Sequence, residues 1–235
     1  MESAARKMAT FPLAVKMVMI DLDGTLIDTV PDLAAAANRM LADFGRAGRD
    51  ESHYRKWIGN GVPRFVKRAL TGEMQAEPET ALFERALALF RKQYGAAVAD
   101  LSRPYAGVVE GIERLSAMGF ELACITNKAE AFTVPLLKQL DLFKCFKLVL
   151  SGDSLPKQKP DPLPLMHACK HFGITSDHGV LVGDSSNDVA AARAAGMPVI
   201  CVTYGYNHGH DIRDSHPDAV VDSLADVPTY LKLFV

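Results

Sequence analysis

The chain has 235 residues, of which 49% are hydrophobic and 23% are charged, and this composition excludes an intrinsically disordered protein. The net charge of −2 gives no overall attraction to nucleic acid or to an anionic membrane, and no stretch reaches the roughly 18 apolar residues of a membrane-spanning helix. The four cysteines have no CxxC spacing, and we interpret them as reduced thiols of a cytoplasmic protein.

The first 16 residues, which include Arg6 and Lys7, have no apolar run long enough for a secretory signal, and we expect an irregular start. After it, short apolar runs rich in Val and Ile alternate with longer segments of helical periodicity. Because these runs are apolar without alternation, they predict parallel strands whose two faces are both covered. The predicted strands are Met17–Ile20, Leu122–Ile125, Leu148–Leu150, Val180–Val182, Val199–Val202 and Ala219–Val221. The predicted helices between them are Val109–Met118, Ala129–Leu140, Pro162–Phe172 and Asn187–Ala195. This order indicates an α/β protein with a Rossmann-like, doubly wound parallel sheet.

The alternation stops for a long segment after the first strand, where helical patterns occur without a convincing strand. Pro31–Phe44 is rich in Ala, and Glu79–Tyr94 repeats apolar residues at helical spacing. This segment is far longer than a normal crossover between parallel strands, so it predicts an inserted helical domain. The predicted organisation is a core of residues 1–29 and 104–235, a helical domain of residues 30–103, and hinges at Asp28–Pro31 and Leu101–Pro104.

Polar residues follow four of the predicted strands. In open parallel sheets ligands bind beyond the carboxyl ends of the strands, so we expect these residues to meet at one edge. Carboxylates held this close repel one another unless a cation lies among them, and oxygen ligands suit Mg²⁺. The residues are Asp21 and Asp23 after the first strand, Thr126 and Asn127 after the second, Lys159 after the third, and Asp184 and Asp188 after the fourth.

The segment Asp21-Leu22-Asp23-Gly24-Thr25 permits a division of labour between two carboxylates. Side chains two residues apart leave a strand on the same side, so one carboxylate can attack as a nucleophile while the other transfers protons. Gly24 then lets the backbone turn closely around an anion. Taken alone, the segment is also compatible with an ordinary acidic turn.

Together, Asp21–Thr25, Thr126–Asn127, Lys159–Pro162 and Gly183–Asp188 resemble the four motifs of the haloacid dehalogenase superfamily, in its phosphatase branch. The helical domain resembles the cap domain of that superfamily. The resemblance implies that Asp21 attacks phosphorus and forms an aspartyl-phosphate, and that Asp23 protonates the leaving group and then activates water.

The same resemblance implies the remaining parts of the site. Mg²⁺ is expected on the Asp21 carboxylate, the Asp23 backbone carbonyl and Asp184, with Asp188 acting through metal-bound water. Thr126 and the Asn127 amide are expected to bind phosphoryl oxygens. Lys159 is expected to neutralise the nucleophile and the transferring phosphoryl group.

Within the superfamily, the cap segment Gly59-Asn60-Gly61 followed by Arg64 resembles the substrate-specificity loop of phosphatases that act on 2-phosphoglycolate. The backbone N–H groups of such a turn could bind a short carboxylate, and Arg64 and Arg68 could add charge. A helix break beside a solvated basic face is the alternative interpretation. The implied activity is Mg²⁺-dependent hydrolysis of 2-phosphoglycolate, with a small phosphate ester as the partner and no nucleic acid or membrane.

Three alternatives stay open at this point. They are a related phosphatase for a sugar phosphate or pyrophosphate, a phosphomutase, and a non-catalytic regulatory or binding protein that accepts phosphate on Asp. Asp23 disfavours the last one, since a general base there speeds loss of the phosphate. The sequence does not decide between monomer and dimer. We interpret His167 and His171, the loop His208–Asp211, and Lys157 as solvent-exposed residues outside the site.

Overall fold

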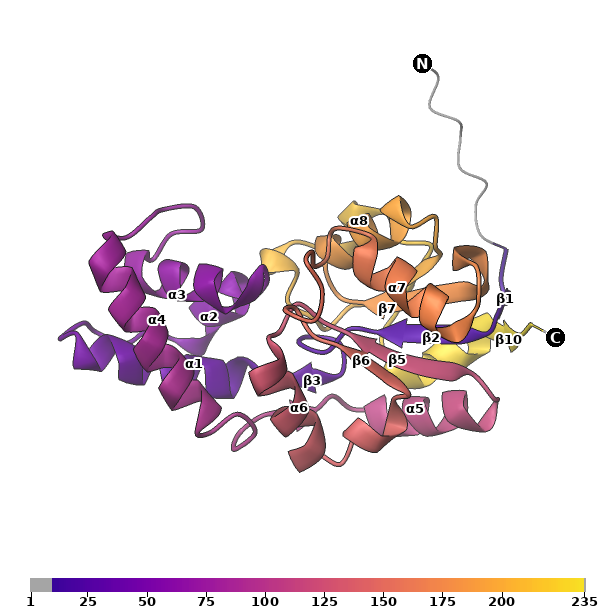
Figure 1. Cartoon of the computed structure of the whole chain (residues 1–235), viewed down its shortest axis with the longest axis horizontal. Helices are drawn as coiled ribbons and strands as arrows, with labels where there is room; N and C mark the ends of the chain where they lie inside the picture. The colour runs from indigo at the N-terminus through magenta and orange to yellow at the C-terminus, as the bar shows by residue number, and fades with distance from the viewer. Residues whose placement is uncertain (1–9, 235) are drawn as a thin grey trace, which may run out of the picture.

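The structure, a computed structural model, describes residues 10–234 (Figure 1). Its centre is a parallel sheet in the order β6-β5-β2-β7-β8-β9. The strands are β2 Met17–Ile20, β5 Glu121–Ile125, β6 Leu148–Leu150, β7 Gly179–Gly183, β8 Val199–Val202 and β9 Ala219–Val221. Because β2 pairs with β5 on one side and β7 on the other, the strand order reverses at β2, and the sheet is doubly wound. The predicted strands are confirmed to within one residue at each end.

Helices cover both faces of this sheet (Figure 1). The four helices are α5 Val108–Ala117 and α6 Glu130–Gln139 on one face, and α7 Leu163–Phe172 and α8 Ser186–Ala194 on the other. Val18 and Ile20 pack in the apolar cluster that includes α5 and α6, whereas Met17 and Met19 pack in the cluster that includes α7 and α8. All four β2 side chains are therefore buried, which explains why the run does not alternate. The expected fold class is confirmed.

A helical segment follows β3 (Ile27–Asp28) and ends at β4 (Arg103–Pro104). We call its helices the helical insertion: α1 Val30–Asp43, α2 Glu51–Trp57, α3 Gly61–Thr71 and α4 Thr80–Gly95. Figure 1 shows it beyond one end of the sheet. Since β3 and β4 pair antiparallel, the chain enters and leaves the insertion side by side.

Asp32, in the first turn of α1, fixes this junction. Its Oδ2 accepts hydrogen bonds from Ser102 N at 2.7 Å and from Ser102 Oγ at 2.6 Å, and it is buried. The start of α1 is thus tied to the segment that leads into β4. Asp32 lies one residue beyond the predicted hinge Asp28–Pro31, and Ser102 lies within the predicted hinge Leu101–Pro104.

The chain ends contain a feature that the sequence analysis missed. β1 (Leu13–Val15) pairs in parallel with β10 (Leu231–Leu233), so the expectation of an irregular start is wrong for residues 13–15. The reason is that β10, from the opposite end of the chain, supplies the hydrogen-bond partners. Arg6 and Lys7 lie outside the described residues.

Short 3-10 helices complete the described elements. They are η1 Phe143–Cys145, η2 Ser176–His178, η3 Asn207–Gly209, η4 Ile212–Ser215 and η5 Leu224–Tyr230. Within residues 10–234, no helix has the length and apolar character needed to cross a membrane. The four cysteines are free.

Candidate active site

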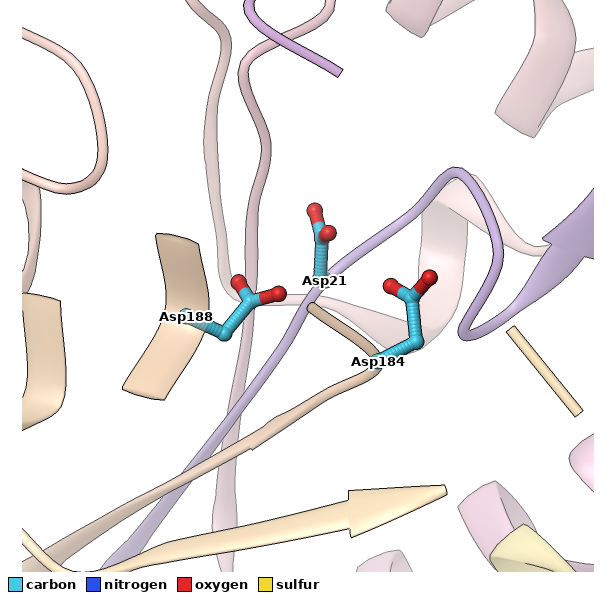
Figure 2. A group of neighbouring side chains, drawn as sticks. All are labelled: Asp21, Asp184 and Asp188. Carbon is cyan, nitrogen blue, oxygen red and sulfur yellow. The ribbon is translucent and has the colours of Figure 1, made fainter. Parts of the chain in front are cut away.

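Three carboxylates meet at the carboxyl ends of the central strands. Asp21 directly follows β2, Asp184 directly follows β7, and Asp188 lies in the first turn of α8. One oxygen from each lies within 4.8 Å of the others, and Figure 2 shows the Asp188 carboxylate turned toward Asp21 while Asp21 and Asp184 project to the same side. All three residues are buried. The expected convergence of the first and fourth clusters is thus observed.

Lys159 supplies one positive charge to this group. Its Nζ lies 2.8 Å from Asp21 Oδ1 and 2.6 Å from Asp188 Oδ1. Burial opposes the charge of this ammonium, but the two carboxylates outweigh that effect and raise the pKa of Lys159. Lys159 is therefore protonated and holds Asp21 and Asp188 together.

Asp188 is held from its other side by the start of α8. Its Oδ2 accepts from Ser185 N at 3.1 Å and from Ser185 Oγ at 2.6 Å, so Ser185 and Asp188 form a capping box. Local helix-start chemistry therefore aims the other Asp188 oxygen at Lys159.

One ammonium does not balance three buried carboxylates. Burial raises the pKa of Asp21 to about 7, with Lys159 opposing and Asp188 reinforcing the shift. Burial, followed by the charges of Asp188 and Asp21, also raises the pKa of Asp184 well above its usual value. Among residues 10–234, the hydrogen bonds to the Asp184 oxygens come from neutral donors, Thr25 Oγ1 at 2.9 Å and Tyr206 N at 2.7 Å. An oxygen-rich, under-neutralised cluster of this kind fits a divalent metal ion.

Asp23 faces a cation that the sequence analysis did not single out. Lys128 Nζ lies 3.0 Å from Asp23 Oδ1 and 3.2 Å from Asp23 Oδ2. The same ammonium lies 4.8 Å from the centre of the Tyr94 ring, which belongs to α4 of the helical insertion. Burial opposes its charge, but Asp23 and Tyr94 raise the pKa of Lys128. Its position directly after Thr126-Asn127 was the available signal.

Thr126 and Asn127 follow β5 and line the same pocket. Thr126 Oγ1 accepts a hydrogen bond from Lys128 N at 3.2 Å, so its hydroxyl hydrogen is available to a ligand. Asn127 Nδ2 donates to the backbone oxygen of Lys159 at 2.8 Å. The Asn127 side chain thus ties the second cluster to the third.

The pocket lies between these strand ends and the helical insertion, which contributes apolar side chains to its wall. The lining residues from the insertion are Leu33, Ile58, Gly59, Gly61, Val62 and Phe65. The turn that contains two of them is tightly bent, with φ of 111° at Gly59, 63° at Asn60 and 80° at Gly61. A Cβ on Gly59 would lie 2.9 Å from Cε1 of His208, so glycine is what permits this close approach.

Two arginines of α3, Arg64 and Arg68, do not add positive charge to the pocket as we expected. Arg68 is buried and donates to Trp57 O at 2.7 Å and to Asn60 Oδ1 at 3.1 Å, so it supports the turn from behind. Arg64 donates to Glu77 at 2.7 Å and to Gln75 and does not line the pocket. The structure does not bring Arg64 to the site, because the segment between α3 and α4 provides nearer partners.

His208 corrects part of the expectation for the loop His208–Asp211. Its Nδ1 lies 3.0 Å from Lys56 O, and the half-buried ring lines the pocket beside Gly59. Burial lowers the pKa of His208. The expectation of a polar surface loop missed this contact with α2 because it joins residues far apart in sequence. The expectation of solvent exposure agrees with the structure for His167, His171 and Lys157.

The chain belongs to the haloacid dehalogenase-like hydrolases, because the model of that family matches residues 18–202. It is similar to the phosphoglycolate phosphatase of Thiobacillus denitrificans, with 58% identity over 219 residues that cover 93% of this chain and 96% of the relative. It is similar to the phosphoglycolate phosphatase of Nitrosospira multiformis, with 53% identity over 94% of this chain and 98% of the relative. A crystal structure of a predicted phosphoglycolate phosphatase from Haemophilus somnus matches with a TM-score of 0.84 and 36% identity, over 91% of this chain and 96% of that one. The resemblance inferred from the four motifs is confirmed.

Proposed function

We propose that this protein is a cytoplasmic, Mg²⁺-dependent phosphatase that hydrolyses 2-phosphoglycolate to glycolate and phosphate. The observation that carries the proposal is the contact of Lys159 Nζ with Asp21 at 2.8 Å, beside the buried acidic cluster. This arrangement gives a nucleophile, a fixed cation and a metal site at one strand edge, which is what phosphoryl transfer needs. The names of the two relatives support the substrate.

The residues that would hold Mg²⁺ are Asp21, Asp184 and the backbone carbonyl of Asp23, with Asp188 acting through water. When bound, the ion supplies positive charge that offsets the phosphoryl oxygens and keeps the carboxylates ionised. Thr126 Oγ1 and the Asn127 N–H then donate to phosphoryl oxygens, while Lys159 neutralises negative charge from the other side.

In the first step, an Asp21 carboxylate oxygen forms a bond to phosphorus, and the bond from phosphorus to the glycolate oxygen breaks. Asp23 donates its proton to that departing oxygen, so glycolate leaves with a neutral hydroxyl. In the second step, Asp23 takes a proton from water, whose oxygen attacks phosphorus and releases the Asp21 carboxylate. The cycle returns both side chains to their starting states.

We propose that residues 30–103 act as a cap on a core of residues 1–29 and 104–235. The cap supplies the apolar wall of the pocket and the Gly59-Asn60-Gly61 turn beside it. Closure over the substrate excludes water from the aspartyl-phosphate until glycolate has left. The paired strands β3 and β4 are the hinge.

The test is phosphate release from 2-phosphoglycolate, a sugar phosphate and pyrophosphate, with Mg²⁺ and with a chelator, using Asp21→Asn as the blank. We expect metal-dependent turnover with kcat/KM for 2-phosphoglycolate at least about tenfold above the others. Equal and weak rates on all three compounds would support a phosphatase but contradict 2-phosphoglycolate as its substrate. Isomerised product without free phosphate would indicate a phosphomutase.

A further inference from the structure

Lys128 is a cation of the pocket that the mechanism above leaves without a role. Among the described residues that line the pocket, Lys159 and Lys128 are its two lysines, and no arginine joins them. Lys159 is engaged by Asp21 and Asp188, at the position of the nucleophile. A second anionic group of the substrate, away from phosphorus, therefore needs a cation other than Lys159.

The ammonium of Lys128 is fixed beside the proton-transferring carboxylate. Both oxygens of Asp23 contact it, at 3.0 and 3.2 Å, and the Tyr94 ring covers it from the insertion side. Its backbone is held as well, since Lys128 N donates to Thr126 Oγ1 and Lys128 O accepts from Thr133 Oγ1 at 3.0 Å. Its side chain is only 2% exposed, so little conformational entropy remains to be lost on binding.

We infer that Lys128 binds the carboxylate of the leaving group and sets the preference for short anionic phosphate esters. This inference rests on the proposed function. Asp23 must reach the oxygen that leaves phosphorus, and in 2-phosphoglycolate one methylene separates this oxygen from the carboxylate. The carboxylate is thereby brought to the ammonium that Asp23 itself contacts. An ammonium has three N–H donors, so it can serve both carboxylates.

The cap arginines do not provide this charge. The Arg64 guanidinium is paired with Glu77 and Gln75, and Arg68 donates to Trp57 O and Asn60 Oδ1. Neither lines the pocket. His208 does line it, but burial lowers the pKa of its ring and disfavours a positive charge. Lys128 is left as the charged partner for the leaving group.

The experiment compares three esters of equal chain length: 2-phosphoglycolate, the neutral glycolaldehyde phosphate and the cationic phosphoethanolamine. Steady-state kinetics with Mg²⁺ are measured for the wild type and for Lys128→Met, Lys128→Gln and Lys128→Arg. Lys170→Met, on the exposed side of α7, is the matched control. We expect Lys128→Met to lower kcat/KM for 2-phosphoglycolate about 10- to 100-fold more than for glycolaldehyde phosphate, as for loss of a charged hydrogen bond.

The variants separate this role from a purely structural one. Lys128→Arg keeps the charge and is expected to retain the preference for the anionic ester. Lys128→Gln keeps a donor for Asp23 and serves as the neutral variant if Lys128→Met does not fold. Equal losses on all three esters in the neutral variants would mean that Lys128 only positions Asp23, and would overturn the inference. A wild type inactive on 2-phosphoglycolate removes the proposed function instead, so the two failures are distinguishable.

Discussion

The backbone N–H of Tyr206 donates to Asp184 Oδ2 at 2.7 Å, and the hydroxyl of the same tyrosine donates to Asp28 Oδ1 at 2.7 Å. That hydroxyl also accepts from Thr29 N at 2.8 Å, at the start of α1. One residue thus connects a carboxylate of the acidic cluster to the start of the helical insertion.

Tyr206→Phe is expected to destabilise the start of the helical insertion while it leaves the acidic cluster nearly unchanged. The substitution removes the partner of the buried Thr29 N–H but keeps the backbone N–H that reaches Asp184. We expect the free energy of unfolding to fall by about 1–2 kcal/mol and Mg²⁺ affinity to change by less than about threefold. Chemical denaturation and calorimetric titration measure the two quantities. Tyr230→Phe, at a half-buried ring that packs on Phe11, is the control.

Gly59→Ala is expected to disturb the pocket more than a matched glycine substitution. Both Gly59 and Gly45 have positive φ, at 111° and 66°, so alanine strains the backbone at either site. Only at Gly59 would the new Cβ meet the His208 ring, whereas nothing lies within 4 Å at Gly45. We expect Gly59→Ala to lower kcat/KM for 2-phosphoglycolate about tenfold or more, and Gly45→Ala to cost stability only. Equal kinetics in the two variants would contradict the role of this contact.

Asp21→Asn is expected to stabilise the metal-free protein at high pH. The folded state raises the pKa of Asp21 from 3.8 to about 7, so it retains a proton that the unfolded chain releases near pH 4. The contribution of this carboxyl to stability is therefore fully present below pH 4 and is lost as pH rises through 7. Asparagine stays neutral, so in chelator at pH 8 the variant should exceed the wild type by roughly 1–3 kcal/mol.

The comparison of Asp21→Asn with the wild type is made by denaturant unfolding at pH 5 and pH 8. The difference between the two proteins should shrink toward pH 5 and should shrink again when Mg²⁺ is added at pH 8. A constant difference across this range would show that burial of the Asp21 charge does not cost stability.

Lys159→Met is expected to have opposite effects on turnover and on metal binding. Removal of the ammonium leaves Asp21 and Asp188 without their shared cation, so phosphoryl transfer should slow by at least about a thousandfold. The cluster becomes more negative, and Mg²⁺ should bind more tightly, by about tenfold. Titration calorimetry and phosphate release test this pair of effects, with Lys170→Met as control. Parallel losses of binding and activity would indicate a collapsed site.

Much of the fold follows from local patterns. The fully apolar runs and the helix spacing predicted the strands of the main sheet, because a two-sided buried strand cannot alternate. The pairs β1–β10 and β3–β4 were missed because their strands have two or three residues and their partners are distant in sequence. Such strands are defined by the pairing itself rather than by composition.

The site divides in the same way. The positions of Asp21, Asp184 and Lys159 could be predicted because these residues follow strands of the sheet, whose carboxyl ends meet at one edge. Lys128 was missed although it directly follows Thr126-Asn127, because its contact with Asp23 depends on the direction of a long side chain. We expected Arg64 at the site because it is close in sequence to the glycine turn, but its side chain donates to Glu77 instead.

The most direct test of the proposed mechanism is to identify the phosphorylated residue during turnover. The enzyme is acid-quenched while it hydrolyses 2-phosphoglycolate with Mg²⁺, the acyl phosphate is reduced with borohydride, and the peptides are mapped by mass spectrometry. We expect conversion of Asp21 to homoserine, dependent on both substrate and Mg²⁺ and absent from Asp21→Asn. Reduction at another carboxylate, or steady turnover by Asp21→Asn, would contradict it.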